Sequence, residues 1–250
     1  MEPKPRIALL IDADNAPARQ LTTVLDDLAR IGECNIRRAY GNWDAPNLKG
    51  WKDSLHGNAI RPIQQYALTV AKNASDMALV VDAVDLLHRD RPSGFAIVSS
   101  DSDFTPLVMY LRERGVDVYG YGNRNTPEAF SSACSKFLFL DGPVGETPDE
   151  NEVAEVVTVT PRPRKTKTEL RQDTALLRLL RGAIAATSDE TGWSRASAIG
   201  QHISNQSPFD ARNFGYPRLT DLMRATELFD CREDGTPAIA FKDKRQTKST

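Results

Sequence analysis

Short apolar runs alternate with amphipathic stretches through the first 140 residues. The first run, Ile7 to Ile11, is uninterrupted, as expected of a central parallel strand buried on both faces. From Pro17 to Gly32, apolar residues recur at helical spacing, and the final glycine suits a helix C-cap. Strands that alternate with helices predict an α/β fold, with a mostly parallel sheet and helices on both faces. The further predicted strands are 35–40, 59–65, 95–99, 116–121 and 137–140, and the further helices are 47–56, 77–89, 104–114 and 127–132.

The predicted helix 77–89 carries many apolar residues, from which we expect one buried face. Ser75 or Asp76 is placed to act as its N-cap. We interpret His88 as a packed histidine rather than a catalytic base, because it shares the apolar positions. The residues expected to face the core are Met77, Val80, Val81, Val84, Leu87 and His88.

The pattern changes after Leu140. Residues 142–168 are first rich in Gly, Pro and Glu and then basic, without a helical period, which predicts a flexible linker. From Glu169 onward helical apolar stripes return, and the runs 228–232 and 238–241 are spaced to form a hairpin around Asp234-Gly235. Helices followed by a hairpin predict a small winged-helix-like domain. We therefore expect an N-terminal domain at 1–141, a linker at 142–168 and a C-terminal domain at 169–245.

The composition of the chain indicates which cellular compartment and which kinds of binding partner to expect. The chain has 32 Lys and Arg against 34 Asp and Glu, so any surface for nucleic acid must be local. The three cysteines form no CxxC pair, which argues against a zinc ribbon and a disulfide framework, and isolated cysteines suit a reducing cytoplasm. No apolar run is long enough for a signal peptide or a membrane span. We expect a soluble, cytoplasmic protein.

Three aspartates occupy junctions between predicted elements. Asp12 ends the first strand, Asp101 follows strand 95–99, and Asp76 starts the helix before that strand. If those two strands are adjacent in a doubly wound sheet, all three carboxylates fall at one carboxyl edge. Like charges in contact raise one another's pKa unless a cation binds, and oxygen-only ligands suit Mg²⁺ or Mn²⁺. Such an ion can polarise a phosphodiester and activate water.

A plainer interpretation competes for each aspartate, because Asp at a strand-to-helix junction is an ordinary N-cap. Asp103, beside Phe104, is divided between ligand and cap, and Asp14 suits either the site or bulk water. No P-loop or GxGxxG follows the first strand, which argues against a nucleotide cofactor.

Three segments, IALLIDADN, KNASDMALVVDAVDL and IVSSDSDF, together resemble the NYN domain of the LabA-like branch of the PIN-like nuclease superfamily. The resemblance covers roughly 6–140 and implies a PIN-like sheet with a metal-dependent ribonuclease site. Matched by motif, the implied catalytic and metal-binding residues are Asp12, Asp76, Asp101 and Asp103. The resemblance further implies that Asn15 orients Asp12 or contacts substrate, that Ser100 and Thr105 are supporting donors near the substrate, and that Lys72 meets a phosphate.

The segment from about Glu169 to Lys242 resembles an OST-HTH, or LOTUS, domain. The resemblance rests on Gly192-Trp193-Ser194, Pro208-Phe209 and the run FGYPRLTDL from Phe214, in which Pro217 departs from the family's pattern. It implies a winged-helix-like fold associated with RNA binding and protein contacts. The candidates for phosphate contacts are Arg162, Arg164, Lys165, Lys167, Arg212 and Arg218.

The hypothesis from the sequence is a metal-dependent endoribonuclease, using Mg²⁺ or Mn²⁺ and tethered to an RNA-binding module. The resemblance implies products with a 5′-phosphate and a 3′-hydroxyl. Two alternatives stay open: a non-catalytic RNA-binding or regulatory adaptor, and a HAD-like phosphohydrolase, suggested by DADN after a strand but weakened by Asn15. The sequence leaves open the RNA target, the number of ions, a homo-oligomeric state, and whether the C-terminal domain contacts RNA, DNA or protein.

Overall fold

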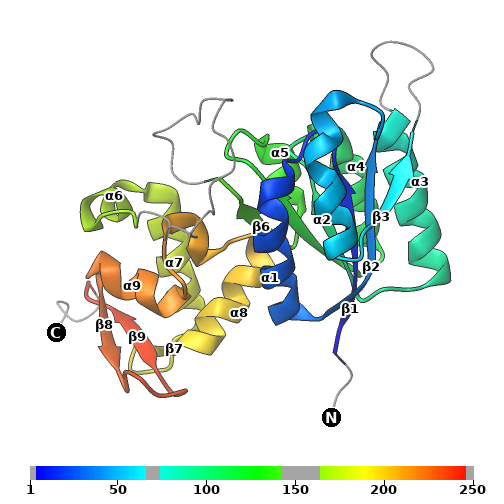
Figure 1. Cartoon of the computed structure of the whole chain (residues 1–250). Coiled ribbons are helices and arrows are strands. Elements are labelled where there is room, and N and C mark those ends of the chain that lie inside the picture. The colour runs from blue at the N-terminus through cyan, green and yellow to red at the C-terminus, as the bar shows by residue number, and fades with distance from the viewer. Residues whose placement is uncertain (1–3, 66–73, 142–163, 246–250) are drawn as a thin grey trace. The chain divides into compact units, whose positions relative to one another are not determined.

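The computed structural model describes residues 4–65, 74–141 and 164–245. The chain divides into two compact units, Met1–Asp141 and Gly142–Thr250 (Figure 1). Lys72, Arg162 and most of the expected linker lie outside the described residues. Within the described ranges, no helix is long and apolar enough to cross a membrane.

The N-terminal unit is built on one sheet of six parallel strands in the order β3-β2-β1-β4-β5-β6 (Figure 1). This confirms the predicted α/β architecture. The chain leaves β1 toward one edge of the sheet and returns at β4 to build the other, so β1 and β4 flank the switch point, where open α/β sheets bind ligands. The strands are β1 Arg6–Asp12, β2 Glu33–Gly41, β3 Arg61–Gln64, β4 Gly94–Val98, β5 Asp117–Gly122 and β6 Lys136–Phe139.

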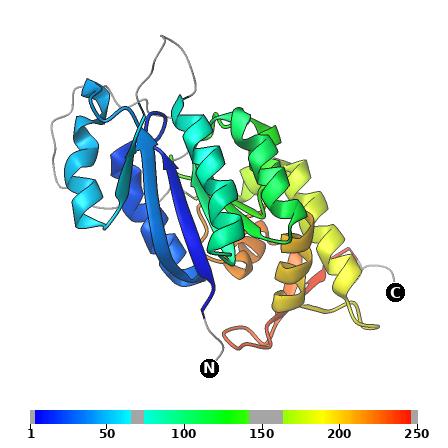
Figure 2. The ribbon, with the colours of Figure 1, turned by 90° about the vertical axis from the view of Figure 1, so that its right-hand side faces the viewer.

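Helices cover both faces of this sheet (Figure 2). In β1 the side chains alternate: Ile7, Leu9 and Ile11 pack toward α1 and α2, while Ala8 and Leu10 pack toward α3, α4 and α5. The uninterrupted apolar run thus reflects burial on both sides, as predicted. The helices are α1 Leu21–Ile31, α2 Lys52–Gly57, α3 Ala74–Arg89, α4 Thr105–Glu113 and α5 Glu128–Ala133.

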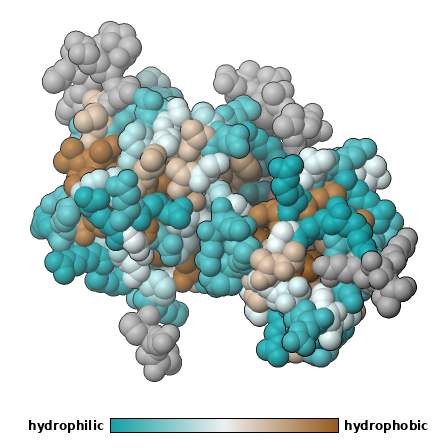
Figure 3. All heavy atoms as spheres, turned by 180° about the vertical axis from the view of Figure 1, so that it is seen from behind, coloured by the Kyte–Doolittle hydropathy of each residue, from teal (hydrophilic) through white to brown (hydrophobic). Residues whose placement is uncertain are grey.

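The predicted inner face of α3 was half right: Leu87 is buried and Val80 and Val84 pack against the core, whereas the other three residues do not. Met77 and Val81 are 61% and 64% exposed, and His88 is exposed, with its Nε2 3.4 Å from the Tyr110 hydroxyl. Apolar residues surround much of this helix, so spacing alone did not choose between two stripes. Apolar side chains accordingly gather on parts of the N-terminal unit's surface (Figure 3). The residues buried on α3 are Leu79, Ala83, Leu86 and Leu87.

The start of α3 also differs from the prediction. The helix already begins at Ala74, so Ser75 and Asp76 lie inside its first turn rather than at the N-cap. A carboxylate in a first helical turn still interacts favourably with the helix dipole.

The C-terminal unit combines helices with a three-stranded antiparallel sheet in the order β7-β9-β8, which confirms a small winged-helix-like domain. The predicted hairpin is the pair β8 and β9, whereas the two-residue β7 was too short to predict. The apolar stripe that returns near Glu169 is carried by two helices, and Asp173 caps the second of them by accepting a hydrogen bond from Leu176 N at 3.0 Å. The elements are α6 Lys167–Gln172, α7 Thr174–Thr187, β7 Ser194–Arg195, α8 Ala196–Gln206, α9 Leu219–Thr226, β8 Phe229–Arg232 and β9 Ala240–Asp243.

Close packing at the end of β5 gives a prediction about stability. A Cβ at Gly122 would lie 2.6 Å from Thr126 Oγ1 and 2.7 Å from the Ser99 carbonyl oxygen. We expect Gly122→Ala to lower the free energy of unfolding by about 1–3 kcal/mol, because the backbone at Ser99 would have to shift to make room for the new methyl group. Urea denaturation measures this. The control is Gly50→Ala, whose Cβ meets nothing within 4 Å; equal losses in both variants would contradict the prediction.

Candidate active site

The candidate site lies where β1 and β4 end side by side. The two strands pair in register as far as Ile11 and Val98, so the next residues, Asp12 and Ser99, are neighbours at the carboxyl edge. Both are about 1% exposed, and the Ser99 hydroxyl donates to Asp12 Oδ2 at 2.7 Å. Asp12 therefore occupies the switch point of the sheet, as the pattern of strands predicted.

The two oxygens of the Asp12 carboxylate have different surroundings. Oδ2 accepts hydrogen bonds from Ser99 Oγ and, at 2.9 Å, from Asn15 Nδ2. Oδ1 is buried and has no hydrogen-bond partner among the described residues. Burial raises the pKa of Asp12, and the charge of Asp14 adds to this, while the hydrogen bonds from Asn15 and Ser99 lower it. A buried carboxylate oxygen without a donor is costly in a folded protein and is suited to a cation.

Asp76, in the first turn of α3, has a pKa that is raised by burial and, in part, by the charges of the other carboxylates. Its pKa is raised to about 6, first by burial and then by the charges of Asp12, Asp101, Asp14 and Asp103. Three separate segments thus contribute negative charge to one region: the end of β1, the start of α3 and the turn after β4. The largest causes of the shift of the Asp76 pKa all raise it.

The turn after β4 uses its aspartates differently from the prediction. Asp101 Oδ1 accepts from Asp103 N at 2.8 Å and so caps the short turn Ser102–Phe104. Asp101 N in turn donates to Ser99 Oγ at 3.1 Å. It is therefore Asp101, not Asp103, that serves as the cap, while Asp103 is exposed. The second oxygen of Asp101 is not used in the capping bond.

Asp14 belongs to the same acidic region, although it was not placed there from the sequence. The Ser75 hydroxyl donates to Asp14 Oδ2 at 2.6 Å, which joins the turn after β1 to the first turn of α3. Asn42 N lies 3.4 Å from Asp14 Oδ1. The spacing of Asp12 and Asp14 was visible in the sequence, but the contact with Ser75 depends on the fold.

The residues expected to lie near the substrate differ in the groups to which their side chains are hydrogen-bonded. Asn15 orients Asp12 by the hydrogen bond described above. Ser100 Oγ accepts from Asn123 N at 3.0 Å, and Thr105 Oγ1 donates to Ser102 O at 2.6 Å, so both hydroxyls bond to nearby backbone. The sequence also gave no role to Ser99, which bonds to both Asp12 and Asp101; its place at the end of an apolar strand was the available signal.

A polar contact joins α3 to β2, the strand that pairs with β1 next to Asp12. Tyr40 pairs with Asp12 in the sheet register, and its hydroxyl donates to Asp82 Oδ2 at 2.5 Å. Arg38 Nη1 lies 2.5 Å from the other oxygen of Asp82. Burial and the Asp82 carboxylate raise the pKa of Tyr40, so the hydroxyl keeps its proton and remains a donor. These bonds fix α3 against β2 and thereby position Asp76.

The carboxylates do not yet form a finished set of metal ligands. In the described ranges, no three His, Cys, Asp or Glu side chains lie close enough together to hold an ion as they stand. Carboxylates without a counter-ion repel one another, which favours separation. Nevertheless, the buried Asp12 Oδ1 and the raised pKa of Asp76 are features that a bound cation would relieve.

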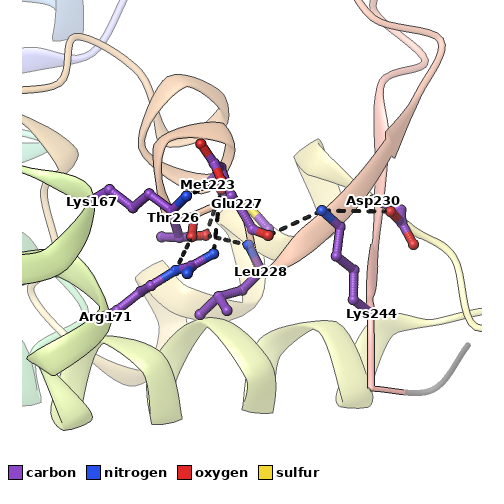
Figure 4. A network of polar contacts seen from close by, with 8 residues as sticks. All are labelled: Lys167, Arg171, Met223, Thr226, Glu227, Leu228, Asp230 and Lys244. Atoms are coloured by element: carbon purple, nitrogen blue, oxygen red, sulfur yellow. Dashed lines mark hydrogen bonds and ion pairs between the residues drawn. The ribbon is translucent and has the colours of Figure 1, made fainter. Parts of the chain in front are cut away.

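The basic residues predicted to bind RNA are mostly engaged in structural contacts. Arg212 forms a two-point ion pair with Asp210 (Nη2–Oδ2 2.6 Å, Nε–Oδ1 3.0 Å), and Lys165 pairs with Asp173 at 3.2 Å. Lys167 pairs with Glu227 in a network that includes Arg171 and Lys244 (Figure 4). The Arg164 guanidinium lies 5.9 Å from the centre of the Tyr216 ring, while Arg218 is exposed.

Comparison with known proteins gives two family matches and several more distant similarities. The NYN domain model matches residues 6–141, and the OST-HTH/LOTUS domain model matches residues 170–240. The uncharacterized protein MJ0482 of Methanocaldococcus jannaschii is 29% identical over 145 residues, which are 56% of this chain and 56% of that protein. The chain thus spans just over half the length of this relative.

Solved structures are similar over a comparable part of the chain. A protein of unknown function, VPA0982 from Vibrio parahaemolyticus RIMD 2210633, is 20% identical over 56% of this chain and 96% of its own, with a TM-score of 0.48. The periplasmic component of an ABC-type sugar transport system from Hahella chejuensis is 13% identical over 54% of this chain and 38% of its own, with a TM-score of 0.29. The NYN model matches more than half of the chain and coincides with the six-stranded sheet, so the chain belongs to the NYN domain family of the PIN-like nuclease superfamily and carries a C-terminal OST-HTH/LOTUS domain.

Proposed function

We propose that this protein is a metal-dependent endoribonuclease whose site is the acidic region at the ends of β1 and β4. The observation that carries the proposal is the Asp12 carboxylate, which is buried at the switch point with one oxygen doubly hydrogen-bonded and the other without a donor. Family membership supports a nuclease, and the chemistry of the side chains supports a divalent cation.

Asp12, Asp76, Asp101 and Asp103 are the residues that would hold the ion. Oxygen-only ligands favour Mg²⁺ or Mn²⁺ over softer metals. A bound ion would supply Lewis acidity at the scissile phosphodiester and would lower the pKa of the attacking water. Asp14 adds a further negative charge to this region, and that charge contributes to the raised pKa values of Asp12 and Asp76.

The chain's own residues orient these carboxylates. Asn15 and Ser99 hold Asp12 Oδ2 and so fix the direction of Oδ1. The bonds from Tyr40 and Arg38 to Asp82 hold α3 in place, which keeps Asp76 beside the site. Because a ligating carboxylate must be ionised, we expect the cation to compete with a proton on Asp76 near pH 6.

We further propose that the C-terminal unit binds RNA. The family match supports this role, and the charge of the unit's described residues, 164–245, supports it as well. From Arg164 to Arg245 the sequence has fourteen Lys or Arg and eleven Asp or Glu, a net charge of +3, whereas the whole chain has −2. Local positive charge of this kind attracts phosphate.

One observation favours a second candidate function, a non-catalytic RNA-binding adaptor. The described side chains do not form a preassembled set of metal ligands. Such a protein would bind RNA and leave it intact with Mg²⁺ or Mn²⁺ present, so a cleavage assay separates the two functions.

The first prediction for the site concerns cleavage of single-stranded RNA with Mn²⁺. We expect Asp12→Asn to lower the rate by at least about 100-fold, because losing a ligand should cost at least as much as the roughly 10–100-fold loss caused by removing its hydrogen-bond partners. Ser99→Ala, which removes one such partner, should cost about 10–100-fold. The rates are measured by gel electrophoresis of an end-labelled oligonucleotide.

The matched control is Asp26→Asn, which removes an exposed carboxylate of α1 and should leave the rate unchanged. Circular dichroism checks that each variant is folded. Full activity in folded Asp12→Asn would contradict the site assignment. If the unaltered protein binds RNA but cleaves none with either ion, the adaptor is the correct function.

The second prediction concerns stability against pH without divalent metal. The pKa of Asp76 is about 6 in the folded protein and ordinarily 3.8, so the folded state binds more protons between these values. Stability therefore falls as pH rises through this window. The shift corresponds to about 3 kcal/mol, but Asp76 is half-exposed, and the helix dipole opposes the effect by about 0.5 kcal/mol. We expect Asp76→Asn to raise the free energy of unfolding by about 1 kcal/mol at pH 7.5.

Urea denaturation in EDTA at pH 7.5 and pH 3.5 tests this second prediction. The gain should nearly disappear at pH 3.5, where Asp76 is protonated in the folded state and mostly protonated in the unfolded state. Mn²⁺ at pH 7.5 should stabilise the unaltered protein more than the variant, because the ion binds only the folded acidic region. A gain of equal size at both pH values would show that the charge of Asp76 is not responsible.

A further inference from the structure

The solvent-facing side of α7 forms an open groove of about 520 Å³ in the C-terminal unit. The opposite side of this helix is buried in the core through Leu176, Leu180 and Ile184. None of the basic residues predicted from the sequence to bind RNA lines the groove. Its lining residues are Thr174, Leu177, Arg178, Arg181, Gly182, Ala185 and Arg245.

The groove is positively charged. The helix contributes Arg178 and Arg181 and contains no Asp or Glu, and Arg245 follows β9. Asp243 pairs with two of these residues: its Oδ2 lies 3.3 Å from Arg181 Nε and 2.9 Å from Arg245 Nη2. Three guanidinium groups against this one carboxylate leave a local charge of +2.

Two of the arginines retain capacity for another acceptor. Arg178 is exposed and forms no ion pair with any carboxylate among the described residues. The Arg181 Nε is buried and, despite its distance of 3.3 Å from Asp243, has no hydrogen bond within the described part of the chain. By contrast, Arg212, Lys165 and Lys167 are each neutralised by a carboxylate.

The shape of the groove suits an extended chain that lies along the helix. Gly182 and Ala185 are small, and a Cβ at Gly182 would meet nothing within 4 Å. From Thr174 to Ala185 the helix rises by about 16 Å, which matches about five stacked nucleotides of one strand. Guanidinium groups bind phosphate oxygens through paired donors, and Leu177 offers an apolar surface to sugars and bases.

We propose that this groove binds the phosphodiester backbone of single-stranded RNA through Arg178, Arg181 and Arg245. The inference rests on the proposed RNA-binding function of the C-terminal unit and names the surface responsible. Recognition by phosphate contacts is independent of base sequence and weakens with salt. The residues from Lys165 to Lys167 and Arg212 then stabilise the fold of the unit and do not hold the strand.

The test measures binding of a fluorescein-labelled 12-nucleotide oligouridine by the full chain in EDTA, with fluorescence anisotropy at several salt concentrations. EDTA separates binding from cleavage. We expect Arg178→Glu to weaken binding by about 10-fold or more, and Arg178→Ala to lower the salt dependence by about one phosphate contact. Gly182→Leu should weaken binding without a change in charge, because it fills the groove while leucine favours a helix over glycine.

The matched control is Arg195→Glu, an equal change of charge at another exposed arginine of this unit. Unchanged binding in this control, with weakened binding in Arg178→Glu and Gly182→Leu, supports the groove. Equal weakening in Arg178→Glu and Arg195→Glu would overturn it in favour of diffuse attraction. If the groove variants bind RNA as tightly as the unaltered chain does, the proposal is overturned and a protein partner is left as the occupant of the groove. The proposal is also overturned if the unaltered chain binds no oligouridine. Binding through the groove without cleavage in Mn²⁺ would refute the nuclease alone.

Discussion

The candidate site depends on how one carboxylate is held at the centre of a parallel sheet. Ser99 and Asn15 donate to the same oxygen of Asp12, which leaves the other oxygen buried and without a donor among the described residues. Such an arrangement is unfavourable for an isolated anion and suited to a cation. The raised pKa of Asp76 reflects the same excess of negative charge from a second element. A bound divalent ion would therefore relieve both features at once.

The sheet brings these groups together because β1 and β4 are neighbours at the point where the order of strands reverses. Asp12 and Ser99 come from positions 87 residues apart in the chain, yet they are adjacent at the carboxyl edge. Helix α3 adds Asp76 from one side, and the bonds from Tyr40 and Arg38 to Asp82 fix that helix against β2. The site is thus supported by regular elements, with the turns after β1 and β4 supplying the remaining polar groups.

The sequence predicted the parts of this account that follow from strong local patterns. The uninterrupted run before Asp12 and the abrupt end of the strand before Asp101 identified the two central strands and their acidic ends. The inner face of α3 was not predictable in the same way, because apolar residues occupy most of its circumference. The choice of Asp101 rather than Asp103 as the cap depends on backbone geometry after the strand, and the role of Ser99 depends on a pairing between distant strands. The basic residues near Lys165 drew attention by their density in the sequence, but their carboxylate partners come from elsewhere in the fold, whereas the groove gathers arginines from α7 and the end of β9.

The central claim is that the acidic region at the ends of β1 and β4 holds a divalent cation. The most direct measurement is a crystal structure of the unaltered protein grown with Mn²⁺, with anomalous diffraction recorded at the manganese absorption edge. The account predicts an anomalous peak bound by Asp12 Oδ1, with oxygens of Asp76 and the Asp101 turn within about 2.0–2.6 Å, the range of oxygen ligands to hard divalent cations. A well-ordered acidic region with no peak at saturating Mn²⁺, or a peak bound only by other residues, would contradict it.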